Sequence, residues 1–170
     1  SGKSLIIYVL VRWYLENFND NVLIVVPTTS LVEQMYNDFK DYGYDVETNC
    51  HRIYSGKDKN TDKRIIISTW QSIYRLQHSW FEQFGAVFGD ECHGFKSKSL
   101  TLIMNKCKEA EYRFGTTGTL DGALTHELVL QGLFGKVYRV TSTRALQDDD
   151  TLAKLNICLL YTSDAADEAK

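Results

Sequence analysis

Residues 22–35 have the sequence VLIVVPTTSLVEQM, and this stretch decides the expected fold. Its first half, Val22 to Val26, is a run of apolar residues that stops at a proline, which is the pattern of a short strand buried on both faces of a sheet. Its second half predicts a helix, because Ser30 and Glu33 have the spacing of a capping box and Gly43 is a typical helix end. The apolar positions that recur at helical spacing are Leu31, Val32, Met35, Phe39 and Tyr42.

Short apolar runs alternate with helical patterns along the rest of the chain. The runs 65–67, 86–88 and 112–114 predict three more buried strands, and the run 137–140 predicts a further one. This alternation predicts the α/β class, in which helices cover both faces of a mostly parallel central sheet and so form three layers. Because ligands of such sheets bind at the carboxyl ends of the strands, functional residues are expected in the turns that follow strands.

The composition is that of a soluble globular domain. The chain has 170 residues, of which 44% are apolar and 24% charged, and its net charge of -3 excludes a histone-like polycation while leaving room for a local basic strip. The apolar run from Leu5 to Val11 is too short to span a bilayer, so no membrane partner is expected. Four scattered cysteines favour reduced thiols and a cytoplasmic location over a disulfide scaffold.

The last residues of the chain break this pattern. Residues 158–170 resemble translated sequencing-adapter read-through, so we expect them to be a non-native tail. The expected domain therefore covers residues 1–157.

The first four residues, Ser1 to Ser4, match the end of a P-loop, G-x-x-x-x-G-K-[ST], and a helical apolar segment follows them. In such a loop Gly2 would let the backbone approach a phosphate, Lys3 would reach the β and γ oxygens, and Ser4 could ligate magnesium. The alternative is a serine helix cap after a flexible glycine.

Two adjacent carboxylates, Asp90 and Glu91, follow the predicted strand at 86–88. Carboxylates at the end of a buried strand cost folding free energy unless they coordinate a cation or take up protons. In P-loop NTPases an acidic residue at this place holds magnesium and a second one activates the attacking water. The alternative is a solvated acidic turn.

Three further turns rich in hydroxyl side chains follow predicted strands, at residues 27–34, 68–72 and 113–119. Hydroxyl groups and helix-start amides of this kind suit contacts to a nucleic-acid backbone, which position a protein without reading sequence. Taken one at a time, each turn is better explained as a Ser/Thr-capped helix start.

Together the five segments resemble the motifs of superfamily 2 helicases, in the same order. Residues 90–93, Asp-Glu-Cys-His, resemble the D-E-x-H box of that family. Residues 27–34 resemble motif Ia, residues 68–72 resemble the S/T-x-Q segment, and residues 113–119 resemble motif III, although Leu120 stands where many relatives carry proline. The detailed motif sequences are most similar to those of phage branch-migration helicases, and excision-repair and type III restriction motors share a similar pattern.

The resemblance implies a RecA-like P-loop domain, the first of two, that uses ATP and Mg²⁺ and binds DNA through its backbone. It implies that Gly2, Lys3 and Ser4 bind the nucleotide, that Ser4 and Asp90 hold the metal, and that Glu91 orients and deprotonates the attacking water. The residues implied as nucleic-acid contacts are Pro27, Thr28, Thr29, Thr69 and Gln71. The residues implied to couple the nucleotide state to DNA grip are His93, Thr117 and Thr119.

The expected function is that of an ATP-dependent DNA helicase or translocase, a hydrolase that unwinds or branch-migrates recombination and repair intermediates. The alternatives are an excision-repair-like or restriction-type translocase, a small P-loop kinase, and a nucleic-acid-binding module that does not hydrolyse ATP. We expect these 170 residues alone to be inactive, because they hold only the end of the P-loop and lack the second RecA-like domain with its arginine finger. The expected location is the cytoplasm, which is the host's if the gene belongs to a phage.

Two other patterns have weaker functional interpretations. The side-by-side pairs Cys50-His51 and Cys92-His93 lack the spacing of zinc ligands. The basic residues Lys57, Lys59, Lys63 and Arg64 are interpreted as a solvated loop, with a nucleic-acid patch as the alternative.

Overall fold

The computed structural model describes residues 2–92, 97–118 and 124–136. Residues 1–136 form one compact unit, and residues 137–170 form a second unit that lies outside the described residues. The predicted strand at 137–140 and the predicted domain end at 157 therefore also lie outside the described residues.

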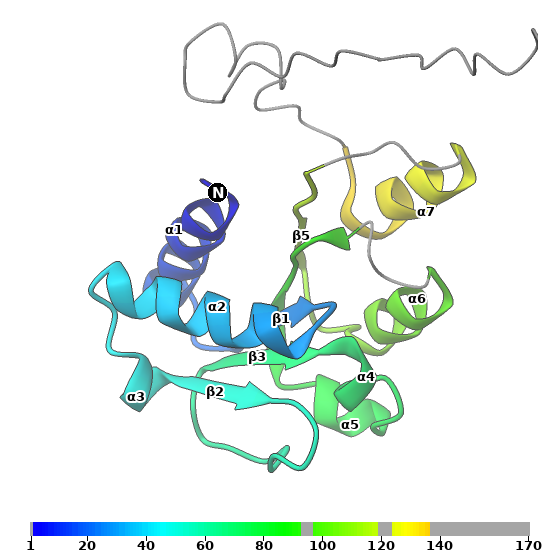
Figure 1. Cartoon of the computed structure of the whole chain (residues 1–170). Coiled ribbons are helices and arrows are strands. Elements are labelled where there is room, and N and C mark those ends of the chain that lie inside the picture. Colours follow the sequence, from blue (N-terminus) through cyan, green and yellow to red (C-terminus); the bar gives the residue numbers. More distant parts are fainter. Residues whose placement is uncertain (1, 93–96, 119–123, 137–170) are drawn as a thin grey trace, which may run out of the picture. The chain divides into compact units, whose positions relative to one another are not determined.

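The described part of the chain contains a parallel sheet of five strands in the order β2-β3-β1-β4-β5 (Figure 1). The strands are β1 (Asn21–Val26), β2 (Cys50–Ile53), β3 (Ile65–Thr69), β4 (Phe84–Gly89) and β5 (Tyr112–Gly115). The predicted α/β class with a mostly parallel sheet is confirmed. Four of these strands lie where the apolar runs predicted them, and β2 was not predicted.

The helices lie on both faces of the sheet and make the expected three layers. They are α1 (Gly2–Asn17), α2 (Thr29–Asp41), α3 (Val46–Asn49), α4 (Trp70–Ile73), α5 (His78–Phe81), α6 (Ser97–Lys106) and α7 (Leu124–Phe134). Helices α1 and α2 pack on one face, and α4 to α7 pack on the other.

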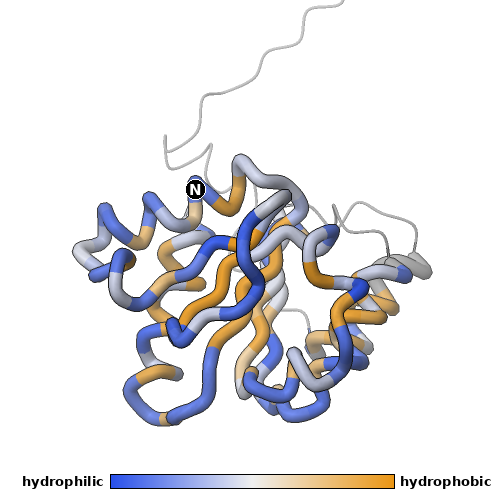
Figure 2. The backbone as a smooth tube through the Cα atoms, turned by 90° about the horizontal axis from the view of Figure 1, so that it is seen from below, coloured by the Kyte–Doolittle hydropathy of each residue, from blue (hydrophilic) through white to orange (hydrophobic). Residues whose placement is uncertain are grey.

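Strand β1 shows why both faces must be covered. Val22, Ile24 and Val26 belong to the core under α1 and α2, whereas Leu23 and Val25 belong to the core under α4, α5 and α6. All five side chains are fully buried. Figure 2 shows this burial as a hydrophobic centre formed by the strands and flanked by more hydrophilic segments.

The start of α2 differs from the prediction. Thr28, and not Ser30, is the N-cap residue: its backbone is extended and its hydroxyl accepts a hydrogen bond from the Leu31 amide at 3.3 Å. The predicted capping box is wrong because Glu33 instead accepts a 2.6 Å hydrogen bond from Arg52 of β2. The predicted end is confirmed, since Tyr42 caps the helix and Gly43 follows with a left-handed φ of 81°.

The basic stretch before β3 serves partly to hold the fold together. The Arg64 guanidinium donates to the Leu15 carbonyl in the last turn of α1 at 3.3 Å, where helix carbonyls lack a partner within the helix. It also donates to the Phe18 and Asp20 carbonyls just beyond the helix, at 2.7 and 3.1 Å. The Lys63 ammonium donates to the Glu47 and Cys50 carbonyls. Neither the solvated-loop nor the nucleic-acid interpretation therefore accounts for these two residues.

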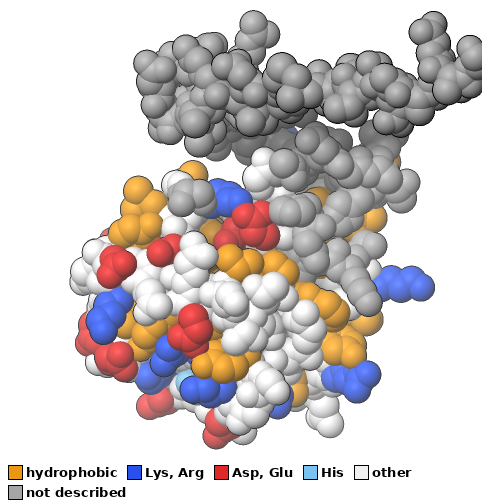
Figure 3. All heavy atoms as spheres, viewed as in Figure 1, with side chains coloured by type: hydrophobic (Ala, Val, Ile, Leu, Met, Phe, Trp, Pro, Cys, Tyr) orange, Lys and Arg blue, Asp and Glu red, His pale blue; other side chains and the backbone are white. Residues whose placement is uncertain are grey.

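Charges of both signs are interspersed on the described surface of the face drawn in Figure 3, with no broad basic patch there. Among the described residues, none of the helices combines the length and apolar character that crossing a membrane requires.

Candidate nucleotide and nucleic-acid site

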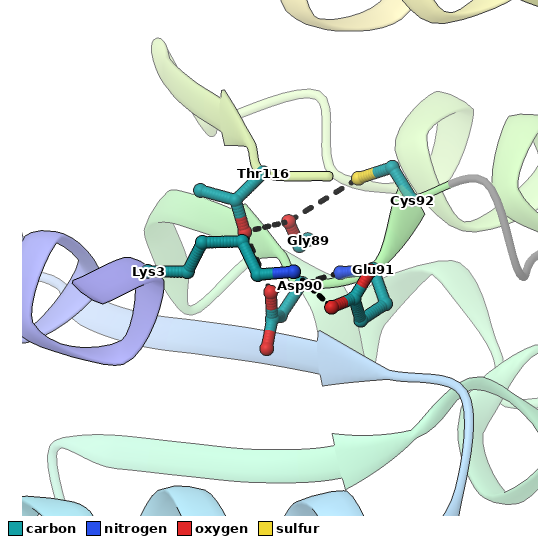
Figure 4. A network of polar contacts seen from close by, with 6 residues as sticks. All are labelled: Lys3, Gly89, Asp90, Glu91, Cys92 and Thr116. Carbon is teal, nitrogen blue, oxygen red and sulfur yellow. Dashed lines mark hydrogen bonds and ion pairs between the residues drawn. The ribbon is translucent and has the colours of Figure 1, made fainter. Parts of the chain in front are cut away.

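The first turn of α1 and the end of β4 meet at the carboxyl edge of the sheet (Figure 4). The Lys3 ammonium forms an ion pair with Oε1 of Glu91, although 88 positions separate the two residues in the sequence. Both side chains are about three-quarters buried, with exposed fractions of 23% and 25%. The fold thus brings together the cation and the carboxylate that the sequence analysis singled out.

Asp90 is oriented by hydrogen bonds on one of its oxygens. Its side chain is buried, with 6% exposed, and Oδ1 accepts from the Thr116 hydroxyl at 2.7 Å and from the Glu91 amide at 2.9 Å. The Asp90 amide donates to the Val25 carbonyl at 3.0 Å, which ties the turn to β1. Because both side-chain bonds end on Oδ1, Oδ2 is the oxygen that a cation could take up.

Glu91 has a backbone φ of 50°, the left-handed region that a residue with a side chain enters at a cost of about 1–2 kcal/mol. The next residue holds the turn in this shape: the Cys92 amide donates to the Thr116 carbonyl at 3.0 Å, and its thiol donates to the Gly89 carbonyl at 3.2 Å. The left-handed turn points the Glu91 carboxylate at Lys3.

Thr116 is the residue of this site that sequence reasoning missed. Its hydroxyl donates to Asp90, its amide donates to the Gly89 carbonyl at 2.8 Å, and its carbonyl accepts from Cys92. The pairing of Gly89 with Gly115 places Thr116 beside Asp90. The motif in 113–119 marks this segment, but only the adjacency of β4 and β5 shows which of its threonines faces the carboxylate.

Of the three predicted coupling residues, one lies in the described part of the chain. Thr117 lies in the described loop after β5 and is half-buried, whereas His93 and Thr119 lie outside the described residues. The same loop comes close to Lys3, because a Cβ on Gly118 would lie 3.3 Å from the Lys3 Nζ atom.

The donor set at the head of α1 fits Mg²⁺ better than it fits zinc. Mg²⁺ prefers oxygen ligands, and one or two protein oxygens suffice when substrate phosphates complete its shell. Ser4 follows Lys3, is nearly buried, and has its Oγ 3.0 Å from the Tyr42 Oη; with Asp90 it supplies such oxygens. No group of three or more His, Cys, Asp or Glu that could hold a metal occurs in the described residues.

Two glycines give the end of the sheet a notch that aromatic and thiol side chains fill. A Cβ on Gly89 would lie 2.8 Å from the Cys92 Sγ and 3.1 Å from the Phe134 ring, and a Cβ on Gly115 would lie 3.0 Å from that ring and 3.1 Å from the same sulfur. Burial raises the pKa of the Cys92 thiol to about 12, so this sulfur stays protonated and acts as a hydrogen-bond donor.

This notch yields a stability prediction. Replacing Gly115 by alanine should lower the free energy of unfolding by about 1–3 kcal/mol, because the added methyl overpacks a filled site. Gly132 in α7 is the matched control: its Cβ would meet nothing within 4 Å, so Gly132→Ala should stabilise by about 0.5–1 kcal/mol. Urea unfolding of the two variants measures both values, and an undiminished stability of Gly115→Ala would contradict the tight packing.

The predicted nucleic-acid residues cluster at the ends of β1 and β3, which are neighbours with Val26 opposite Thr69. Thr28 and Thr29 are exposed at the start of α2, and Pro27 is half-buried. Thr69 is buried, with 5% exposed, and its hydroxyl is 2.8 Å from the Ser72 Oγ. Gln71 is exposed, and its amide nitrogen donates to the Pro27 carbonyl at 3.1 Å.

The order and geometry of these segments agree with comparisons to known proteins. Residues 1–122 match the family model described as "Type III restriction enzyme, res subunit". The chain belongs to the type III restriction enzyme res-subunit family. This match, together with the relatives described next, confirms the resemblance to superfamily 2 helicases.

The chain is 34% identical over 165 residues to the ATP-dependent DNA helicase uvsW of Enterobacteria phage T4. The match covers 95% of this chain but only 33% of that protein, so the chain spans about a third of the relative's length. A crystal structure of the UvsW helicase from bacteriophage T4 superposes with a TM-score of 0.72 and 36% identity, over 81% of this chain and 50% of that one.

A solved structure of lower identity shows the fold alone. The helicase domain of Pyrococcus furiosus Hef superposes with a TM-score of 0.64 at 19% identity, over 79% of this chain and 31% of that chain. The RecA-like architecture expected from the sequence is thereby confirmed.

Proposed function

We propose that the chain is the first motor domain of an ATP-dependent DNA helicase or translocase that unwinds or branch-migrates recombination and repair intermediates. The observation that carries this proposal is the meeting of Lys3 with Glu91 beside the buried Asp90, at the carboxyl edge of a parallel sheet. The identity to the T4 protein supports an ATP-dependent DNA helicase, and the family description keeps a restriction-type translocase as the second candidate. Its location would be the cytoplasm, which is the host's for a phage-encoded protein.

Each residue of the nucleotide site has a proposed role. Gly2 and Lys3 bind the phosphates at the start of α1, and Ser4 and Asp90 hold Mg²⁺ directly or through water. When bound, Mg²⁺ neutralises charge that develops on the phosphate oxygens. Glu91 orients the attacking water and accepts its proton.

The ion pair itself has a consequence for this mechanism. While Lys3 pairs with Glu91, the ammonium is neutralised by the carboxylate instead of by a phosphate. The β and γ phosphates would compete for Lys3 and release Glu91 toward water. Nucleotide binding would therefore prepare the base at the same step at which it fills the site.

The proposed DNA contact is the start of α2. The amides of Thr29 and Ser30 head a helix of 13 residues whose N-terminus favours anions, and Thr28 is exposed beside them. These groups, with Pro27 and the neighbouring turn that holds Thr69 and Gln71, form the proposed site for the DNA backbone, which is bound independently of sequence. His93, Thr117 and Thr119 couple this grip to the nucleotide.

DNA-dependent ATP turnover tests the function against its rivals. The protein to use, here named the completed protein, is this chain with the first four positions of the P-loop pattern added before Ser1 and a second RecA-like domain added after residue 157, both taken from T4 UvsW. The proposal expects ATP hydrolysis that rises when DNA is added. A P-loop kinase would show no rise with DNA, and a binding module would show no hydrolysis.

Replacing Thr28 by alanine should weaken DNA binding about 3–10-fold and to the same extent for unrelated sequences, because a lost backbone contact carries no sequence information. Anisotropy of labelled oligonucleotides at one salt concentration measures this. Thr28→Ser keeps both the hydroxyl and the helix cap and should bind as the wild type does. Thr48, an exposed threonine of α3 before β2 at the opposite edge of the sheet, is the control position; a loss confined to one DNA sequence would argue for base contacts instead.

A further inference from the structure

One hydrogen bond joins the two turns of the proposed DNA site. Strands β1 and β3 lie side by side and in register up to Val26 and Thr69, so the turns that follow them are adjacent. Across the gap the side-chain amide of Gln71 donates to the Pro27 carbonyl at 3.1 Å.

This bond acts on the residue that starts α2. The Pro27 carbonyl belongs to the same rigid peptide plane as the Thr28 nitrogen, so holding the oxygen fixes the plane from which Thr28 extends. Thr28 has φ of -135° and ψ of 156°, its hydroxyl accepts from the Leu31 amide, and its carbonyl accepts from the Val32 amide at 3.2 Å. The direction of the first amides of α2 thus depends on the Pro27–Thr28 plane.

The neighbouring hydroxyls are not arranged as an independent contact. Thr69 is buried and its hydroxyl is already paired with the Ser72 hydroxyl. The exposed Gln71 side-chain amide directs one donor toward Pro27. The second turn is therefore bonded to the first one through Gln71.

We propose that Gln71 is a positioning residue, which fastens the Pro27–Thr28 peptide so that the start of α2 keeps the geometry that binds a phosphate. The two turns then act as one unit, with Thr28 and the α2 amides as the contact and Gln71 as its support. This inference rests on the proposed function for its role in DNA binding, but its structural half holds for the protein without DNA.

The variant to make is Gln71→Met, because methionine has a similar length and volume but no hydrogen-bond donor. Gln77→Met is the matched control, since Gln77 is another exposed glutamine, at the start of α5, and has no side-chain bond to α2. Both variants are made in the 170-residue chain, with and without Thr28→Ala.

Hydrogen exchange of the protein without DNA tests the structural half. Gln71→Met should speed exchange of the Leu31 and Val32 amides about 3–10-fold, as expected for the loss of one hydrogen bond that supports them, and Gln77→Met should not. Unchanged exchange in Gln71→Met would overturn the proposal whatever the protein binds.

A double-mutant cycle on DNA affinity tests the functional half. Gln71→Met should weaken binding about 3–10-fold in the wild-type background and less than about 2-fold in the Thr28→Ala background, because the capping hydroxyl through which Gln71 directs the α2 amides is then already gone. Equal losses in both backgrounds would assign Gln71 to a direct DNA contact and overturn the proposal. A wild-type chain that binds no DNA would instead overturn the DNA-binding part of the proposed function, and the exchange result would still stand.

Discussion

Replacing Glu91 by glutamine in the completed protein should lower ATP turnover about 10²–10⁴-fold and leave nucleotide binding nearly intact, because a positioned general base contributes a factor of that size. Glutamine has the same shape as glutamate and can still accept a hydrogen bond from Lys3, but it cannot accept a proton from water. The phosphate-binding groups of α1 are unchanged, and the loss of the competing carboxylate frees Lys3 for the phosphates. Single-turnover hydrolysis and the affinity for an ATP analogue measure the two quantities.

The control for this experiment is Glu109→Gln, an exposed glutamate between α6 and β5, which should change neither quantity. An equal loss of binding and turnover in Glu91→Gln would assign this carboxylate to the metal. Unchanged turnover would remove Glu91 from the chemistry, and the proton acceptor would then have to be sought elsewhere.

The 170-residue chain should hydrolyse ATP negligibly even with DNA, and the completed protein should exceed it by at least about 10³–10⁵-fold, the factor that an arginine finger contributes in related NTPases. The sequence holds only the last four positions of the P-loop pattern, and backbone amides of the loop are part of the phosphate cradle. Phosphoryl transfer depends almost wholly on such positioning and charge, so either addition alone should restore little turnover.

Two intermediate proteins separate the contributions. Adding only the P-loop should restore mainly nucleotide binding, and adding only the second domain should restore neither. Robust turnover by the 170 residues that disappears in Lys3→Ala would show that this domain acts without a partner, and the two-domain mechanism would be abandoned.

The sequence predicted those parts of the fold that depend on burial from both sides. Strands β1, β3 and β4 are found because strands covered on two faces are continuous apolar runs. Strand β5 is an edge strand that is only half-buried, and its two aromatic residues marked it. Strand β2, at the other edge, was missed because it carries His51 and Arg52 between its buried ends and so has no apolar run. The start of α2 was placed at Ser30 because several hydroxyl residues precede the apolar positions, and only the backbone geometry shows that Thr28 is the cap.

The sequence predicted which residues form the candidate site but not the contacts that join them. Lys3, Asp90 and Glu91 were found by motif, and their proximity agrees with the resemblance. The left-handed turn at Glu91, the clamp by Thr116 and the link from Gln71 to Pro27 each depend on which strands are neighbours. The spacing of motifs along a chain does not determine the order of strands in a sheet, so these contacts could not be derived from the sequence.

The buried thiols make the protein convenient for site-specific labelling. Cys50, Cys92 and Cys107 are buried, and burial raises the pKa of each to about 12, so at neutral pH they lack the thiolate that reacts with maleimides. Once Cys158, which lies outside the described residues, is replaced by serine, a single cysteine introduced at an exposed position becomes the reactive one. A dye or spin label could then be attached near the start of α2 without altering the core, and it would follow the proposed DNA-binding turn directly.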